Sequence, residues 1–142
     1  MRVAVQVQEI LPWKQEFSVG VATFDGQHRE LVRLINELHE DMALGRSAEI
    51  LDYVLARLIK YAREHFRAEE SVLHAHAYPR LQVHKAEHMK FIHSVVSFQK
   101  DFLAGRSKPT IELMIFLRDW FSNHTQGTDQ SYVPFLKKRG LA

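Results

Sequence analysis

Hydrophobic residues recur at intervals of three and four positions in four successive stretches of the chain, a pattern that predicts four amphipathic helices. The first is expected to begin with Asp25 as its N-cap, and the second to begin near Ser47. The third and fourth should begin near Pro79 and Pro109, because proline is favoured in the first turn of a helix. Only a few residues connect successive helices, so neighbours should be antiparallel. The predicted fold class is all-α, an up-down-up-down antiparallel four-helix bundle.

The first 24 residues follow a different pattern. Val3, Val5 and Val7 alternate with other residues, and Pro12 follows them. This arrangement predicts an extended segment rather than a helix. We therefore expect residues 1–24 to form an N-terminal arm that packs on a single bundle domain made of residues 25–142.

The composition restricts the class of protein. A chain of 142 residues with 46% hydrophobic content fits one folded domain and is too apolar for disorder. The absence of cysteine excludes disulfides, thiolate zinc sites and iron–sulfur clusters. With 19 basic and 17 acidic residues, the chain has little net charge to attract nucleic acid, and no apolar run is long enough to span a membrane. We therefore expect a cytoplasmic protein with no nucleic-acid partner and no membrane partner.

Five of the nine histidines fall on the apolar stripes of the predicted helices. One glutamate, Glu69, lies one helical turn after His65. These six residues are His28, His65, Glu69, His84, His88 and His124. A single inward histidine is usually a hydrogen-bonded core residue. Burying five imidazoles and a carboxylate without a shared partner would carry a large desolvation cost, which a metal centre removes. The other four histidines are expected at the solvated surface: His39, His74, His76 and His93.

Asp129 is a further candidate ligand. It follows His124 by five residues, which places it about 140° around a regular α-helix from that histidine. Both side chains reach one centre only if the helix ends or bulges between them, and Gly127 in that interval would supply the backbone freedom. The alternative is an exposed aspartate in a terminal loop.

The donor set favours two metal ions. Imidazoles with carboxylates and no thiolate suit iron, manganese or zinc, and seven side chains exceed what one tetrahedral ion can use. Two six-coordinate ions together offer twelve positions. The five histidines would fill five of these positions. Two bridging carboxylates would fill four, and one bridging oxygen from water would fill two. Such a centre would keep a single open position.

The same residues resemble the bacterial hemerythrins over nearly the whole chain, from about Trp13 to Tyr132. The resemblance is carried by Asp25-Gly26-Gln27-His28, His65-Phe66-Arg67-Ala68-Glu69-Glu70, His84-Lys85-Ala86-Glu87-His88, and His124 followed by Asp129. It implies a non-heme pair of iron ions with an oxo or hydroxo bridge. The implied ligands are His84, His88 and His124 for one ion, His28 and His65 for the other, and Glu69 and Asp129 as bridges.

The resemblance also implies a function. Proteins of this kind bind dioxygen reversibly, so we expect a non-enzymatic role in oxygen storage, transport or delivery, with an oxygen-consuming enzyme as a possible recipient. The alternative is a di-iron sensor of oxygen or nitric oxide, or an enzyme that reduces nitric oxide or peroxide at the same site. A structural bundle without metal is a third hypothesis. The sequence leaves open whether the protein is a monomer or a homo-oligomer.

Two positions near His124 depart from the family pattern. Phe121 stands where the family commonly has a leucine beside the bound ligand, and Thr125 replaces a common isoleucine. We expect these changes to alter the lifetime of the oxygenated protein. Trp120 and Tyr61 each lie one turn before a candidate ligand, so with Phe121 they are candidates to line the oxygen pocket or to contact the ligands. A simple aromatic core is the alternative for Trp120 and Tyr61.

Overall fold

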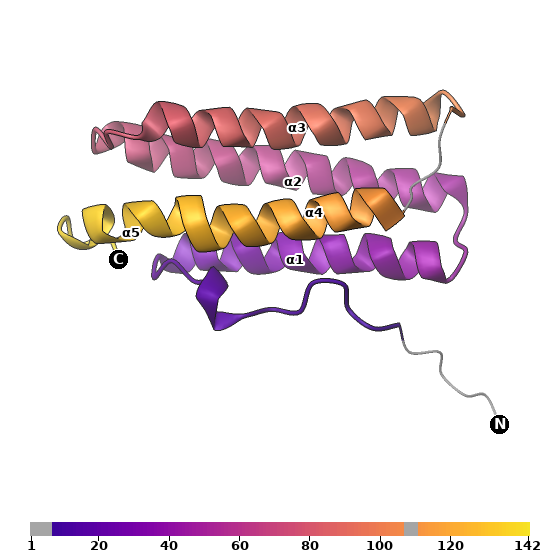
Figure 1. The fold of residues 1–142 in the computed structure, drawn as a ribbon, viewed down its shortest axis with the longest axis horizontal. Coiled ribbons are helices and arrows are strands. Elements are labelled where there is room, and N and C mark those ends of the chain that lie inside the picture. Colours follow the sequence, from indigo (N-terminus) through magenta and orange to yellow (C-terminus); the bar gives the residue numbers. More distant parts are fainter. Residues whose placement is uncertain (1–6, 107–110) are drawn as a thin grey trace.

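The computed structural model describes residues 7–106 and 111–142, and this part of the chain is a bundle of long helices without strands (Figure 1). The helical elements are α1 (Ala22–Ala43), α2 (Ala48–Ala75), α3 (Leu81–Leu103), α4 (Ile111–Asn123), η2 (His124–Asp129) and α5 (Gln130–Lys137). α1 packs against α2 and α4, and α2 packs against α3. Figure 1 shows α4, η2 and α5 following one another along one rod. The predicted all-α four-helix bundle is confirmed.

The start of α1 differs from the prediction. The helix begins at Ala22, so Asp25 lies inside its first turn and is not its N-cap. The Asp25 carboxylate instead accepts hydrogen bonds from the Val19 amide (2.7 Å) and the Ser18 hydroxyl (2.6 Å). A carboxylate in the first turn also interacts favourably with the helix dipole. Asp25 therefore stabilises the helix start by holding the preceding segment against it.

The other helix starts are close to their predicted positions. Ser47 caps α2 as expected, because its side chain accepts a hydrogen bond from the Ile50 amide. α3 begins at Leu81, two residues after Pro79, which lies in the turn between α2 and α3. Pro109, the predicted start of the fourth helix, lies outside the described residues.

The described part of the N-terminal arm runs along α1 (Figure 1). It contains one short 3-10 helix, η1 (Gln15–Phe17). The Leu11 amide donates to Asn36 Oδ1 and the Asn36 side chain donates to the Leu11 carbonyl oxygen, both at 2.9 Å. Leu11 and Phe17 are buried in the main apolar cluster, so the arm closes one side of the bundle. Of the alternating valines, only Val7 belongs to the described residues.

Two apolar clusters fill the bundle. The larger contains residues from α1, α2, α3 and α4, among them Leu38, Leu55 and Leu117, which are completely buried. The smaller lies toward the start of α1 and includes Phe24 and Tyr132. The polar candidate ligands lie between the two clusters along the helices, where burial on both sides excludes water from them.

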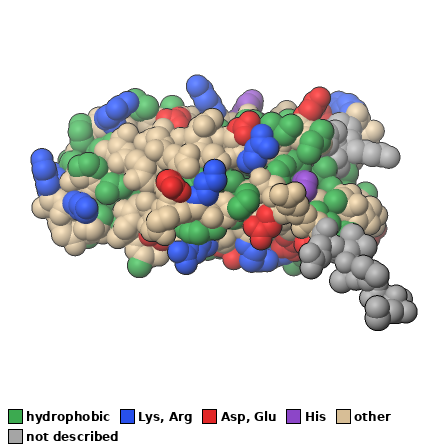
Figure 2. All heavy atoms as spheres, turned by 60° about the horizontal axis from the view of Figure 1, so that its bottom comes forward, with side chains coloured by type: hydrophobic (Ala, Val, Ile, Leu, Met, Phe, Trp, Pro, Cys, Tyr) green, Lys and Arg blue, Asp and Glu red, His purple; other side chains and the backbone are tan. Residues whose placement is uncertain are grey.

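The described surface carries mixed charge. On the face shown in Figure 2, Lys and Arg side chains are interspersed with Asp and Glu side chains and form no large patch of one sign. None of the helices in the described ranges is both long and apolar enough to cross a membrane.

Candidate metal centre

The seven predicted ligands lie together in the bundle interior. All have side chains at most 4% exposed: His28, His65, Glu69, His84, His88, His124 and Asp129. α1, α2, α3 and η2 each contribute at least one of them. The four-residue spacing on α2 and on α3 places two ligands on the same face of each helix. The structure therefore brings together all seven side chains that the sequence proposed as metal ligands.

η2 explains how His124 and Asp129 point to the same centre. The six residues His124–Asp129 form a π-helix, in which residues five apart stack one above the other. The expected bulge is therefore present. The predicted role of Gly127 is wrong, because its φ is not positive and a Cβ there would have nothing within 4 Å. The bulge does not depend on the special backbone freedom of glycine.

One set of carboxylate oxygens faces three imidazoles. Asp129 Oδ1 lies 3.1 Å from His84 Nε2 and 3.0 Å from His124 Nε2. Glu69 Oε1 lies 3.2 Å from His88 Nε2 and is also in contact with His84 Nε2. The His88 and His124 Nε2 atoms are 3.1 Å apart. We call His84, His88 and His124 the three-histidine group.

The second oxygen of each carboxylate faces the remaining two imidazoles. Asp129 Oδ2 lies 3.3 Å from His28 Nε2. Glu69 Oε2 lies 3.6 Å from His65 Nε2 and 4.0 Å from His28 Nε2. We call His28 and His65 the two-histidine group. Because each carboxylate has one oxygen toward each group, Glu69 and Asp129 are placed to bridge two ions.

Hydrogen bonds behind the imidazoles set their tautomers. Four of the five donate from Nδ1: His28 to the Phe17 carbonyl oxygen (3.3 Å), His65 to Gln27 Oε1 (2.6 Å), His88 to Glu70 Oε2 (2.7 Å) and His124 to Glu87 Oε1 (3.0 Å). A proton on Nδ1 leaves the Nε2 lone pair free for a metal. Both carboxylate partners belong to the three-histidine group, whereas the two-histidine group has neutral partners.

Unpaired polar atoms at the centre show that a metal fits. His28 Nε2 and both oxygens of Asp129 are buried and make no hydrogen bond to any described residue, although ligand nitrogens lie within 3.3 Å of these oxygens. Unpaired buried polar atoms are costly in a folded protein. Atoms that converge without hydrogen-bond geometry are arranged as ligands around a shared cation. Five imidazoles and two carboxylates are the donor types that iron accepts.

The two buried carboxylates control protonation of the neighbouring imidazoles. Burial by itself lowers the pKa of His84, but the carboxylates of Asp129 and Glu69, which face its Nε2 atom, raise this pKa to about 10. Burial dominates at His65 and lowers its pKa to about 4. Burial also opposes ionisation of Glu69 and Asp129, yet the facing histidines hold the pKa of each carboxyl below its usual range. A cation must therefore displace a proton from His84, whereas both carboxylates are already ionised.

Tyr132 is a functional candidate that sequence reasoning missed. Its hydroxyl donates a 2.9 Å hydrogen bond to Glu69 Oε2, on the side of the two-histidine group. Burial and the charge of Glu69 raise the pKa of Tyr132, so the phenol keeps its proton. Its only signal in the sequence is its position three residues after Asp129.

The hydrogen-bond partners of the ligands were also not predicted. Gln27, Glu70 and Glu87 each adjoin a ligand in the sequence, yet each pairs with a histidine of a different helical element. Glu87 additionally accepts from the Thr128 hydroxyl at 2.7 and 2.8 Å. A carboxylate or amide beside a ligand position is therefore the signal that could have found them.

The predicted pocket aromatics occupy different places. The Phe121 ring is buried and meets the His28 ring edge-on at 5.8 Å between centroids, so it lies beside the two-histidine group. Trp120 stacks on His124 at 4.4 Å. Tyr61 is half-buried and packs against the larger apolar cluster. Thr125 is buried beside His124 in η2.

The histidines expected at the surface are not all exposed. His74 and His93 are exposed, whereas His39 and His76 are half-buried. Among the described residues, none of these four belongs to a group of side chains placed to hold a metal.

Comparison with known proteins gives the family. The hemerythrin HHE cation binding domain matches residues 19–136. The bacteriohemerythrin of Methylococcus capsulatus is 36% identical over 121 residues, which is 85% of this chain and 92% of that protein. The bacteriohemerythrin of Clostridium acetobutylicum is 32% identical and covers 85% of this chain and 97% of its own length. A crystal structure of wild-type hemerythrin superposes with a TM-score of 0.83 at 32% identity, covering 88% of this chain and 96% of that one. The chain therefore belongs to the hemerythrin family of oxygen-binding di-iron proteins, which are not enzymes.

Proposed function

We propose that the seven converging side chains hold two iron ions and that the protein binds dioxygen reversibly for storage, transport or delivery. The observation that carries the proposal is the division of the ligands into a group of three histidines and a group of two, with both carboxylates between them. The two-histidine group supplies one protein donor fewer. When bound, the iron pair supplies the electrons and the open coordination position that dioxygen requires.

The residues around the two-histidine group suit a small apolar ligand. The rings of Phe121 and Phe24 lie nearly perpendicular to the rings of His28 and His65, respectively. Phe17 is fully buried next to Phe121. These rings are placed to exclude water from this side of the centre, which would limit the access of solvent protons to a bound gas molecule.

The protonation of nearby groups favours binding over turnover. An enzyme that reduces peroxide or nitric oxide needs a group that gives up a proton at working pH. The Tyr132 phenol donates a hydrogen bond to Glu69, and its raised pKa keeps it there as a donor. Tyr132 therefore fixes the orientation of the bridging carboxylate without releasing its proton.

A cycle of oxygenation and deoxygenation tests the proposal. Protein loaded with iron and reduced without air should develop a new visible absorption band when dioxygen is added, and it should lose the band when dioxygen is removed. The variant His65→Gln, which removes a proposed ligand, should not develop the band. The matched variant His93→Gln, at an exposed histidine outside the centre, should behave as the wild type.

Two outcomes of this cycle contradict the proposal. One is permanent oxidation of the wild-type protein in the first cycle together with catalytic consumption of added peroxide, which supports an enzyme. The other is an unchanged spectrum in protein that contains iron.

As part of the same proposal, the protein works in the cytoplasm and releases its oxygen to an oxygen-consuming enzyme.

A further inference from the structure

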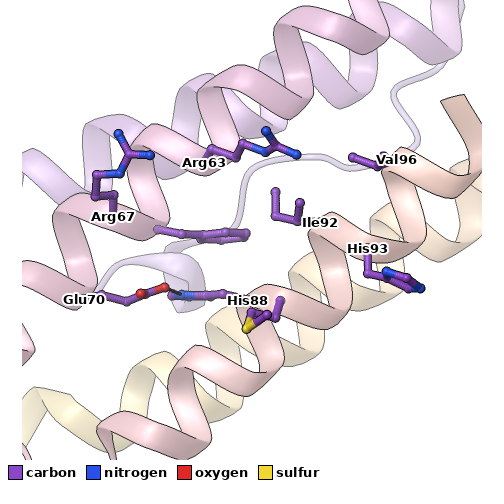
Figure 3. A pocket seen from close by; sticks show the side chains of 9 residues that line it. Arg63, Arg67, Glu70, His88, Ile92, His93 and Val96 are labelled. Atoms are coloured by element: carbon purple, nitrogen blue, oxygen red, sulfur yellow. Dashed lines mark hydrogen bonds and ion pairs between the residues drawn. The ribbon is translucent and has the colours of Figure 1, made fainter. Parts of the chain in front are cut away.

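A second feature of the molecule is a surface pocket between α2 and α3, outside the metal centre. Its volume is about 420 Å³, within the usual range for sites of small organic molecules. Arg63 and Arg67 line it from α2, and Ile92 and Val96 line it from α3 (Figure 3). The ring of Phe66 forms part of the wall.

The polar part of the pocket is cationic. Arg63 and Arg67 are exposed, lie one helical turn apart, and form no ion pair or hydrogen bond with any residue that the structure describes. Glu70 also lines the pocket, but its Oε2 atom accepts the hydrogen bond from His88 at 2.7 Å, shown as a dashed line in Figure 3. Lys60 lines an adjoining pocket that shares both arginines. Two guanidinium groups are thus available to an anion.

The rest of the pocket is apolar and partly aromatic. Met89 at its edge is 72% exposed, the largest exposed fraction among the large hydrophobic side chains of the described residues. Phe66 stacks face to face on His88, with ring centroids 3.8 Å apart. An occupant that covers Met89, Ile92 and Val96 would remove apolar surface from water. The lining therefore fits a molecule with an apolar body and one anionic end.

We propose that this pocket binds a small aromatic carboxylate, with the carboxylate on Arg63 and Arg67 and the ring against Ile92, Val96 and Phe66. Guanidinium groups bind carboxylates through paired hydrogen bonds, and the concave apolar wall accepts the ring. This site is separate from the oxygen-binding position, because it lies behind His88 of the three-histidine group rather than beside the two-histidine group. The proposal does not depend on the protein binding dioxygen.

Calorimetric titration of the iron-loaded protein with 2-naphthoate tests the site. The wild type should bind 2-naphthoate at least about tenfold more tightly than the neutral analogue 2-naphthamide, because the amide lacks the charge that the arginines recognise. The double variant Arg63→Gln/Arg67→Gln should lose at least about tenfold in affinity for 2-naphthoate. Lys90→Gln, which removes one positive charge at an exposed α3 residue outside the pocket lining, should bind as the wild type.

A second pair of variants tests the apolar edge. Met89→Glu places a negative charge there and should weaken binding more than Met89→Gln, which has a similar shape without the charge. All of these positions are exposed, so the helical circular dichroism of each variant should match the wild type. Equal affinity for 2-naphthoate and 2-naphthamide overturns the proposal. Unchanged affinity in the double arginine variant also overturns it, because it shows that the carboxylate binds elsewhere, including at iron.

Discussion

The two halves of the metal centre share both carboxylates but differ in what lies behind their histidines. In the three-histidine group, His88 and His124 donate to the carboxylates of Glu70 and Glu87. In the two-histidine group, His28 and His65 donate to a backbone carbonyl and to the neutral side chain of Gln27. Negative charge is therefore concentrated behind the half with more protein ligands.

The two histidine groups also differ in how aromatic rings contact their imidazoles. Phe66 and Trp120 lie flat on His88 and His124, with centroids 3.8 and 4.4 Å apart. Phe121 and Phe24 instead meet His28 and His65 edge-on. Flat stacking covers one face of each of these two imidazoles, whereas the perpendicular phenylalanine rings do not lie flat on His28 or His65. Under the proposed function, this difference predicts that the three-histidine group holds its ion more firmly and that the two-histidine group accepts the ligand.

Removal of a bridging carboxylate should have the largest effect because it reaches both halves. In Glu69→Gln, the side chain that faces four imidazoles loses its charge, and the iron content should fall from two ions per chain to fewer than one. Elemental analysis of the purified protein measures this. Glu64→Gln, at an exposed glutamate of the same helix, should retain two ions. Full iron content in Glu69→Gln would show that the carboxylate is not a bridge.

Loss of the charge behind His88 should affect one half only. Glu70→Gln keeps a hydrogen-bond acceptor but removes the carboxylate, and changes of this kind typically weaken metal affinity by about ten- to a hundredfold. Timed removal of iron by a chelator should therefore show one ion leaving faster and the other leaving as in the wild type. Gln27→Ala should accelerate loss of the other ion. Equal acceleration of both ions in Glu70→Gln would contradict the division into two halves.

The stability of protein stripped of iron should depend on pH through histidines of both halves, and the largest shifts are those of His84 and His65. The pKa of His84 is raised to about 10, so its contribution is present below the ordinary value of 6.5 and is lost as pH rises toward 10. The pKa of His65 is lowered to about 4, so its contribution is lost as pH falls from 6.5 toward 4. Urea unfolding at a series of pH values should show both declines. The pKa values of His28 and His124 are also raised, so His84→Gln should reduce the alkaline decline without abolishing it, and an undiminished decline would exclude His84 as a cause.

Replacement of the ring beside His28 should have the smallest effect, a change in rate. Phe121→Leu enlarges the space at the two-histidine group and should speed release of dioxygen by a few-fold, as measured by stopped-flow decay of the oxygenated form. Phe116→Leu, on the same helix and in contact with Phe91 and Phe98 instead, is the matched control and should leave the rate unchanged. Identical decay in Phe121→Leu and the wild type would remove Phe121 from the ligand pocket.

The ligands could be predicted from the sequence because helical periodicity fixes which residues share a face. His65 with Glu69 and His84 with His88 needed only that rule and the cost of burying them unpaired. Asp129 also required a bulge, whose presence was inferred correctly but whose cause was not Gly127. The placement of Asp25 was wrong because aspartate serves a helix start both as a cap and as a first-turn acceptor.

The partners of the ligands could not be predicted in the same way. Glu70 contacts a histidine of α3, and Tyr132 reaches Glu69 across the bundle. Such contacts depend on how each helix is rotated about its axis and how far it is shifted along its neighbour, and the apolar pattern fixes neither closely enough. The surface pocket was missed for the same reason, because Arg63 and Ile92 become neighbours only when α2 and α3 pack.

Anomalous X-ray diffraction at the iron absorption edge, from crystals of the iron-loaded protein, tests the central claim most directly. We predict two iron peaks of equal height: one within bonding distance of His84, His88 and His124, the other within bonding distance of His28 and His65, with Glu69 and Asp129 touching both. A single peak, or two peaks of which neither touches both carboxylates, would contradict the account.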